Sequence, residues 1–308
     1  MKQNSFTRRD VLSSLIIAAL SSQSIAKSWT PSRTVAVTIP FTPGGLTDIV
    51  FRNLQKFADE KGVKLVADFK PGAEGLIGMQ HGSRQSTDGH SITLCTIATS
   101  ILKTENGNSI SDSFRLLTAL RTGYMFVVTG AKSGISSFED LLTKLRDPSS
   151  NLTGGSGAPG QKIFINYAFK KLNINATIAS YKGNGPLIQD LIGNHIQYAF
   201  LPAGNVVENI KSGSLKLLAN DRPKNSKIFN DVPNIVDYIP IDAKDMHLIA
   251  LPKQTPDEIF NYWLDFFKQW AEDSSTKTFL NEIFSISVPI GPKFLSESIE
   301  NYKKVYGQ

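Results

Sequence analysis

Cysteine and histidine are scarce in this chain of 308 residues, which contains one cysteine and four histidines. Cys95 has no partner for a disulfide within the chain, and its place in the apolar run 91–97 indicates a buried thiol rather than a lipid-modified one. The histidines are isolated and lack the paired spacing of zinc ligands; they are His81, His90, His195 and His247. We therefore expect no disulfide, no lipid anchor and no resident metal.

Long apolar runs and clusters of like charge are also missing. Beyond residue 26 no segment approaches the ~20 apolar residues that cross a bilayer, so we expect no membrane anchor. The formal net charge is +6, but the basic residues are scattered rather than arranged in stripes, which argues against nucleic-acid binding. With 41% hydrophobic and 19% charged residues, the composition is that of a globular protein, and the length suits two domains.

The first 26 residues have the composition of a signal peptide. Lys2, Arg8 and Arg9 make the start basic, an apolar stretch covers 11–20, and small residues precede an expected cleavage site after Ala26. The segment 7–12 resembles a twin-arginine export signal, and an ordinary secretory signal that happens to carry two arginines is the alternative. Either route predicts an exported protein, whose mature chain has a net charge of about +4.

After the signal, the chain repeats a strand, a glycine-rich turn and a helix. In the first part we expect apolar strands at 35–41, 63–69 and 91–96, with helices at 49–61 and 79–86. A second unit, which starts after the apolar segment 121–129, has expected helices at 137–146, 161–172 and 186–192 and strands at 176–181 and 197–201. The alternation predicts an α/β fold with parallel strands, whose ligands bind at the carboxyl ends of the strands.

A last helix follows the segment 255–258. Its Trp263, Phe267 and Trp270 recur at helical spacing, which predicts that they pack in the core rather than form a surface for a ligand.

Three glycine-rich turns precede expected helices, at 43–48, 71–78 and 154–160. Glycines let backbone N–H groups face outward, and the first turn of a helix adds unpaired donors and the positive end of its dipole. The glycines of any one of these turns could serve only a helix C-cap or a tight turn. Together the turns favour an anion site that is also lined by the hydroxyl groups of Thr47, Thr96 and Ser156. No Gly-Lys-Ser/Thr follows the first turn, which excludes a nucleotide P-loop.

Two catalytic or cofactor motifs are approached without being completed. The segment 155–160 matches G-x-G-x-x-G, but it lacks a clear preceding strand, contains Pro159 and has no later acidic residue for a ribose. The segment 154–158 approaches a nucleophile elbow around Ser156, and its triad histidine would have to be His195 or His247. We expect no cofactor and a binding protein rather than an enzyme, and a secreted hydrolase that uses Ser156 remains the alternative.

Five segments resemble the Bug-type receptors, the extracytoplasmic solute-binding proteins of the tripartite tricarboxylate transporter family. In the family's order and spacing they are Pro-Phe-Thr-Pro-Gly-Gly-Leu-Thr-Asp at 40–48, Lys-Pro-Gly-Ala-Glu-Gly-Leu-Ile-Gly at 70–78, Thr-Asp-Gly-His-Ser-Ile-Thr-Leu at 87–94, Tyr-Lys-Gly at 181–183 and Asp-Val-Pro at 231–233. The resemblance extends from about residue 31 to residue 292.

The resemblance implies a two-lobed periplasmic-binding-protein fold of the Venus flytrap type. One lobe would comprise 27–124 and 220–308, and the other 125–219. It implies a periplasmic monomer that holds a small carboxylate between its lobes and delivers it to the membrane subunits of a transporter; a ligand-sensing partner of a membrane kinase is a further alternative. The implied ligand-binding residues are Phe41, Gly44, Gly45, Thr47, Asp48, Ala73, Gly75, Thr96, Ser100, Ser156 and Tyr181. Asp48 is expected to cap the following helix, since its charge would repel an anionic ligand.

Four positions depart from the family's pattern. Glu74 stands where glycine is usual, Lys162 where histidine is frequent, and Gln197 and Leu201 where acidic residues are common. Glu74 would place a carboxylate beside the second turn, where it would weaken a second carboxylate contact or meet a cationic group of the ligand. The sequence therefore leaves the ligand's identity open.

The twin-arginine interpretation predicts that replacing Arg8 and Arg9 together by lysine stops export of the folded protein. A secretory signal should tolerate this change because lysine keeps the start of the leader positive. Fractionation of cells that express the two versions measures the difference, and normal periplasmic accumulation of the double variant would leave only the secretory route.

Overall fold

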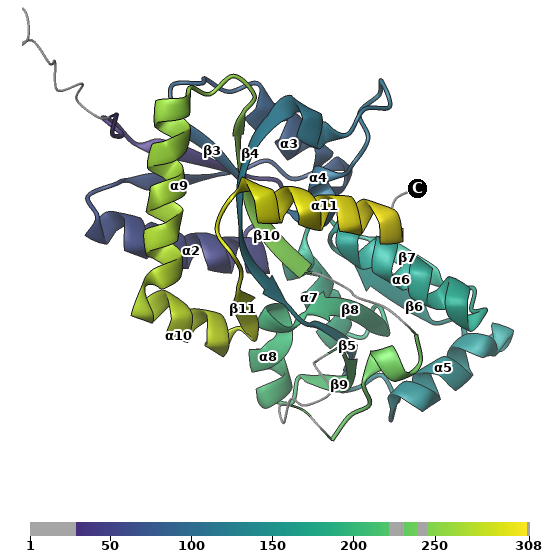
Figure 1. Ribbon diagram of the computed structural model, residues 1–308. Helices are drawn as coiled ribbons and strands as arrows, with labels where there is room; N and C mark the ends of the chain where they lie inside the picture. The colour runs from purple at the N-terminus through teal and green to yellow at the C-terminus, as the bar shows by residue number, and fades with distance from the viewer. Residues whose placement is uncertain (1–28, 222–228, 230, 240–244, 307–308) are drawn as a thin grey trace, which may run out of the picture. The chain divides into compact units, whose positions relative to one another are not determined.

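Two mixed β-sheets with helices packed around them make up the described part of the chain (Figure 1). The computed structural model describes residues 29–221, 229, 231–239 and 245–306, so the predicted signal peptide lies outside the described residues. All described helices and strands belong to one compact unit, residues 31–308. The predicted α/β class is therefore confirmed.

The first sheet combines strands from both ends of the chain. Its order is β11-β4-β10-β3-β1-β2, where β1, β2 and β3 pair in parallel and β10 and β11 pair antiparallel with their neighbours. The strands are β1 (Val35–Ile39), β2 (Leu65–Phe69), β3 (Ser91–Thr96), β4 (Phe114–Gly123), β10 (Asp245–Pro252) and β11 (Ser285–Ser287).

The second sheet is built from one continuous stretch of chain. Its order is β7-β6-β8-β5-β9, where β6 pairs in parallel with β7 and β8, and β5 pairs antiparallel with β8 and β9. The strands are β5 (Met125–Gly130), β6 (Thr153–Ser156), β7 (Thr177–Ser180), β8 (Tyr198–Pro202) and β9 (Leu215–Asn220). The expectation of parallel strands thus holds for three strands in each sheet and is wrong for the others.

The antiparallel strands arise where the chain passes between the sheets. The apolar segment 121–129, expected to precede the second unit, is divided at Tyr124 between the end of β4 and most of β5. Because a single residue connects them, these two strands carry the chain directly from one sheet into the other. An apolar run with no turn signal in it gives no sign of this division.

The helices follow the strands closely. They are α2 (Leu46–Glu60), α3 (Leu76–Ser83), α4 (Ile97–Ser100), α5 (Phe138–Arg146), α6 (Pro159–Leu172), α7 (Asn184–Ile192), α8 (Ala203–Lys211), α9 (Asp257–Glu272), α10 (Ser274–Glu282) and α11 (Pro292–Tyr306), with short 3-10 turns at Ala73–Gly75, Ile110–Ser113, Pro148–Ser150 and Ile235–Asp237. The last helix, α11, contacts β4 and α4 beside the first sheet and also α6 beside the second (Figure 1).

The third glycine-rich turn is shorter than expected because its first residues form a strand. Residues 153–156 are β6, and α6 begins at Pro159. A Cβ atom on Gly154 would lie 2.5 Å from the ring of Tyr198 on the neighbouring strand β8, so glycine is needed there for the two strands to pair. The prediction of a loop at 154–156 is therefore wrong, because these glycines serve the close packing of a strand.

The aromatic residues of α9 lie in the core, as their spacing predicts. Trp263, Phe267 and Trp270 are fully buried. The Trp263 Nε1–H group donates to the Gly89 carbonyl oxygen at 3.0 Å, and the Trp270 Nε1–H group donates to Asn53 Oδ1 at 2.9 Å. Cys95 is also fully buried, and burial raises the pKa of its thiol.

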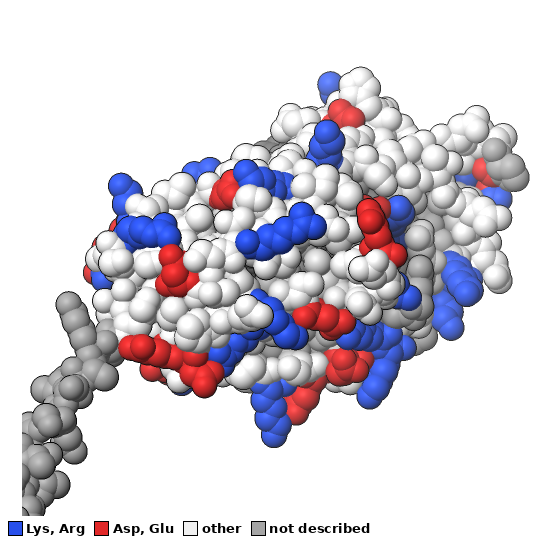
Figure 2. Space-filling model, turned by 90° about the horizontal axis from the view of Figure 1, so that it is seen from above, with Lys and Arg blue, Asp and Glu red and all other residues white. Residues whose placement is uncertain are grey.

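Surface charge, membrane-spanning helices and metal-binding groups can be examined in the described part of the chain. Figure 2 shows basic and acidic side chains interspersed on one face of the molecule. None of the helices in the described ranges combines the length and the apolar character that a membrane crossing requires. Within the same ranges, no group of three histidine, cysteine or acidic side chains is arranged to hold a metal ion.

Replacing Trp270 by alanine should lower the free energy of unfolding by about 3–5 kcal/mol, because it removes a large buried side chain and leaves Asn53 without its donor. Lys268 lies on the exposed face of the same helix, so Lys268→Ala should change the free energy of unfolding by less than about 0.5 kcal/mol. Urea denaturation of both variants checks this; similar losses would show that α9 is not part of the core.

Candidate functional site

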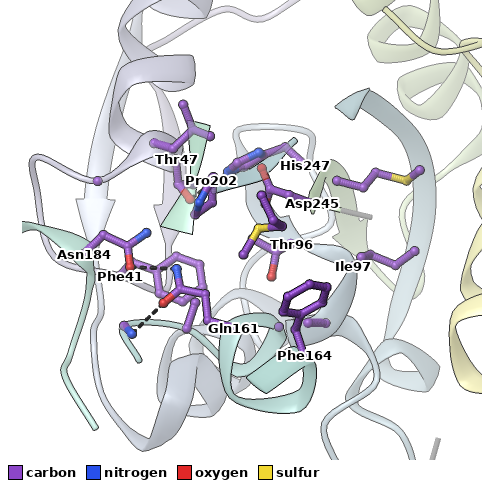
Figure 3. A pocket seen from close by; sticks show the side chains of 18 of the residues that line it. Phe41, Thr47, Thr96, Ile97, Gln161, Phe164, Asn184, Pro202, Asp245 and His247 are labelled. Atoms are coloured by element: carbon purple, nitrogen blue, oxygen red, sulfur yellow. Dashed lines mark hydrogen bonds between the residues drawn. The ribbon is translucent and has the colours of Figure 1, made fainter. Parts of the chain in front are cut away.

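A pocket lies where the loops that follow strands of both sheets come together (Figure 3). Its cavity volume is about 50 Å³. A cavity for a single water needs roughly 10–15 Å³ by the same measure, so the pocket has room for a small organic molecule. The lining residues are Phe41, Gly45, Leu46, Thr47, Thr96, Ile97, Ala98, Met125, Gly157, Ala158, Gly160, Gln161, Phe164, Asn184, Pro202, Asp245, Met246, His247, Tyr302 and Tyr306.

Four of the helices that begin at this pocket have no side-chain cap, and a fifth, the short helix α4, is capped by Thr96. The lining includes the N-cap residues of α2, α6 and α8, which are Gly45, Ala158 and Pro202, and the first residue of α7, Asn184. Each of these helices follows the carboxyl end of a strand that has a parallel neighbour: β1 for α2, β6 for α6, β7 for α7 and β8 for α8. The positive dipole ends of these helices and the unpaired N–H groups at the start of α2 favour a bound anion, whereas the Ala203 N–H group of α8 donates to the Tyr124 carbonyl oxygen and Pro159 of α6 has no N–H group.

The start of α2 leaves its backbone donors available. Its N-cap is Gly45, so no side chain caps the helix. Asp48, in the first turn, accepts a hydrogen bond from the Gly44 N–H group at 2.9 Å and forms an ion pair with Arg52. Asp48 therefore stabilises the loop before the helix and does not line the pocket. The expectation that it caps the helix is wrong, because its carboxylate accepts from a residue before the N-cap.

A chain of amide groups crosses the floor of the pocket. The Gly157 N–H group donates to Gln161 Oε1 at 2.7 Å, and Gln161 Nε2 donates to Asn184 Oδ1 at 2.8 Å (Figure 3). Asn184 Nδ2 donates to Asn205 Oδ1 at 2.9 Å. These bonds fix which way each amide faces. Since an amide nitrogen carries two hydrogens, Gln161 and Asn184 each retain one donor for a ligand.

The other polar wall is a buried network of four side chains. Arg121 on β4 and Thr96 on β3 lie opposite His247 on β10 in the sheet register. An Arg121 guanidinium nitrogen lies 2.6 Å from His247 Nδ1, and the other lies 2.6 Å from Asp245 Oδ2. His247 Nε2 lies 2.8 Å from Thr47 Oγ1. The side chain of Arg121 is only 1% exposed, so its charge is balanced inside the protein by Asp245.

His247 is neutral in this network. Burial, and after it the charge of Arg121, lower its pKa to about 3, although Asp245 acts in the opposite direction. With Arg121 and Asp245 paired and His247 uncharged, the side chains of the network bring no net charge to the pocket. The positive ends of the helices therefore determine its electrostatic character.

Apolar side chains cover most of the remaining wall. They come from the first sheet and its helices as well as from α6, and Figure 3 shows Ile97 and Phe164 across the pocket from Thr47. A ligand that fits both walls has an anionic end near the start of α2 and a hydrocarbon part.

Of the residues expected to bind the ligand, Phe41, Gly45, Thr47 and Thr96 line the pocket. Gly44 and Asp48 lie beside it in the first loop, and Ala73 and Gly75 form the 3-10 turn before α3. The hydroxyl groups of Ser100, Ser156 and Tyr181 donate to Ile97 O, Ala158 O and Asp190 Oδ2, at 2.7, 3.0 and 2.7 Å respectively. The pocket therefore brings together four of the eleven, and the assignment of ligand contacts stays a prediction.

Glu74 does not line the pocket. Its carboxylate lies 2.7 Å from Lys162 Nζ on α6, and both side chains are partly exposed. The two residues that depart from the family's pattern in these loops thus form an ion pair with each other, which satisfies the Glu74 charge without a ligand.

Sequence reasoning missed the network around His247 and the amide chain. Arg121 lies in the mostly apolar strand β4, and Asp245 and His247 lie in the mostly apolar strand β10. A charged or titratable residue in such a strand is the one signal that could have drawn attention to them. Gln161 and Asn184 each follow a glycine-rich turn, where a polar side chain in the first turn of a helix faces the same site as the backbone donors.

Comparison with known protein families places the chain among transport receptors. The family model described as "Tripartite tricarboxylate transporter family receptor" matches residues 50–285. Protein BugT of Bordetella pertussis is 26% identical over 242 residues, which cover 74% of this chain and 73% of BugT. A UPF0065 protein of Cupriavidus necator is 28% identical over 266 residues, covering 82% of this chain and 79% of the relative.

Solved structures share the fold. The periplasmic binding protein BugD superposes with a TM-score of 0.84 at 21% identity, covering 90% of this chain and 96% of BugD. MatC of Rhodopseudomonas palustris with bound malate gives a TM-score of 0.83 at 18% identity, over 90% of this chain and 99% of MatC. Another Rhodopseudomonas palustris protein, with adipate, gives 0.82 at 19% identity, over 89% and 96% of the two chains. The two-lobed fold is thereby confirmed, and the boundaries expected for the lobes stay a prediction.

The low pKa of His247 makes the stability of the fold depend on pH. Below the ordinary histidine pKa of about 6.5, the unfolded chain takes up a proton that the native imidazole does not, so stability falls with falling pH by up to about 1.4 kcal/mol per unit. Between pH 7 and 5, the His247→Gln variant should therefore lose about 2 kcal/mol less than the unmodified protein. Urea denaturation at both pH values measures this, and equal losses would mean that native His247 is protonated as well.

Proposed function

The chain belongs to the tripartite tricarboxylate transporter receptor family, and we propose that it is a periplasmic receptor that captures a small organic carboxylate in this pocket and delivers it to a transporter of that class. The observation that carries the proposal is the convergence of the starts of α2, α6, α7 and α8 on one pocket. Their backbone donors suit carboxylate oxygens.

The charge of the pocket supports an anionic ligand held without a basic side chain. Among the residues that the structure describes, the one charged side chain that lines it is Asp245, which is paired with Arg121 behind the wall. A carboxylate near the start of α2 therefore meets helix dipoles and N–H groups, together with the hydroxyl of Thr47 and the spare amide donors of Gln161 and Asn184. Hydrogen bonds to a charged group are worth about 1.5–3 kcal/mol each.

The ligands of similar proteins agree with this chemistry. MatC holds malate and the second Rhodopseudomonas palustris protein holds adipate, and both ligands are dicarboxylates. The apolar wall around Ile97 and Phe164 suits the carbon chain of such an acid. A hydrolase is not favoured, because the family consists of receptors and the hydroxyl of Ser156 donates to a backbone carbonyl.

We expect the mature protein to bind one carboxylate per chain, and malate and adipate are the first probes. A ligand present at ~100 times its dissociation constant stabilises the native state by about 2.7 kcal/mol, which a thermal shift detects. A broad panel of mono-, di- and tricarboxylates without any shift would contradict the proposal.

Position 45 allows a test of the anion site that leaves the fold intact. A Cβ atom on Gly45 would meet nothing closer than 3.9 Å, and Asp and Asn are both good N-cap residues, so either variant should fold. At an effective dielectric constant of ~20, two like charges ~4 Å apart repel by about 4 kcal/mol, so Gly45→Asp should bind the best probe at least tenfold more weakly than Gly45→Asn. Calorimetry compares the matched pair; equal affinities would place the anion elsewhere.

A further inference from the structure

The hydrogen-bond pattern around His247 determines how Thr47 faces the ligand. A guanidinium group only donates hydrogen bonds, so the His247 Nδ1 atom, 2.6 Å from Arg121, must be the acceptor. A neutral imidazole with Nδ1 unprotonated carries its proton on Nε2. The Nε2–H group therefore donates to Thr47 Oγ1, which lies 2.8 Å away.

The hydroxyl hydrogen of Thr47 is then left for another acceptor. Among the described residues, no side chain or carbonyl group receives it, although Thr47 is 94% buried and lines the pocket. A buried hydroxyl that has already accepted one bond gains most by donating its own hydrogen. The acceptor has to come from the contents of the pocket.

We propose that Arg121 and His247 hold the Thr47 hydroxyl as a hydrogen-bond donor, so that this end of the pocket selects a ligand acceptor such as a carboxylate oxygen and rejects a group that can only donate, such as an ammonium. The proposal rests on the proposed function, since it concerns the same pocket and the same class of ligand. Thr47 is the ligand contact, and His247 and Arg121 are positioning residues that act through it.

The selectivity follows from what a freely rotating hydroxyl would do. A threonine without His247 can either donate or accept, and so tolerates both kinds of ligand group. Once Nε2–H occupies one lone pair of Oγ1, the hydroxyl hydrogen is the group left for the pocket, and a ligand donor placed against it would leave that buried hydrogen without an acceptor. Asp245 Oδ2 receives the bond from Arg121, and among the described residues no hydrogen bond joins Thr47 to the carboxylate of Asp245.

The tautomer of His247 can be measured without any ligand. Two-bond proton–nitrogen correlation spectra of the labelled protein between about pH 6 and 8 distinguish the tautomers, and the His247→Gln spectrum assigns the signals among the four histidines. We expect a neutral ring with the proton on Nε2. A proton on Nδ1, or a charged ring, overturns the proposal.

Binding measurements test whether His247 acts through Thr47. By calorimetry with malate or adipate, whichever binds more tightly, Thr47→Val should weaken binding about tenfold or more, and His247→Leu should do the same. The double variant should bind no more weakly than Thr47→Val alone, since the contact is already gone. Losses that multiply would show that His247 serves only the structure, and would overturn the proposal.

Two controls separate positioning from damage to the fold. His247→Gln should bind within about threefold of the unmodified protein, because its amide oxygen can accept from Arg121 while its nitrogen donates to Thr47. Asn184→Ala, in the amide chain, should combine multiplicatively with His247→Leu. If the unmodified protein binds no carboxylate at all, the proposed function fails, and the tautomer alone then decides whether Thr47 is set as a donor.

Discussion

Backbone N–H groups in the first turn of a helix have no partner within the helix, and the treatment of these groups gives the pocket its character. Ser137 and Asp273 cap α5 and α10, which begin away from the pocket. By contrast, α2, α6, α7 and α8 begin at the pocket without a side-chain cap, and the short helix α4 is the capped exception there. The first N–H group of α8 already donates to the Tyr124 carbonyl oxygen, and α6 starts with Pro159, which has no N–H group. The backbone of the site therefore acts mainly through the start of α2 and the dipoles of the other helices, and it depends on the loops that orient them.

A site of this kind is sensitive to any charge placed near it, which explains the buried network around Arg121. Asp245 lines the pocket, and unpaired it would repel an anion. The Arg121 guanidinium neutralises it and cannot deprotonate, while His247 remains uncharged. The network therefore brings polar groups to the wall without altering the weak positive potential of the helix ends.

The site residues that belong to a local motif could be predicted from the sequence, whereas those that strand pairing brings together could not. The first turn identified Phe41, Gly45 and Thr47 because a strand, two glycines and a helix start stand side by side at 35–48. The α/β class and the family followed from the same repeats. Arg121 and His247 are 126 positions apart, and only the antiparallel pairing of β4 with β10 places them opposite each other. No local pattern encodes that pairing, nor the parting of β4 from β5 at Tyr124.

The position of β10 in the first sheet has a consequence for the order in which the molecule is completed. This strand lies between β3 and β4, although the whole second sheet precedes it in the chain. During synthesis the first sheet lacks its interior strand until residues 245–252 have emerged, whereas every strand of the second sheet is available by residue 220. Such long-range pairing forms slowly because a large loop must close first. Since Asp245 and His247 arrive with that same strand, the polar wall of the pocket is absent from every shorter, nascent form of the chain.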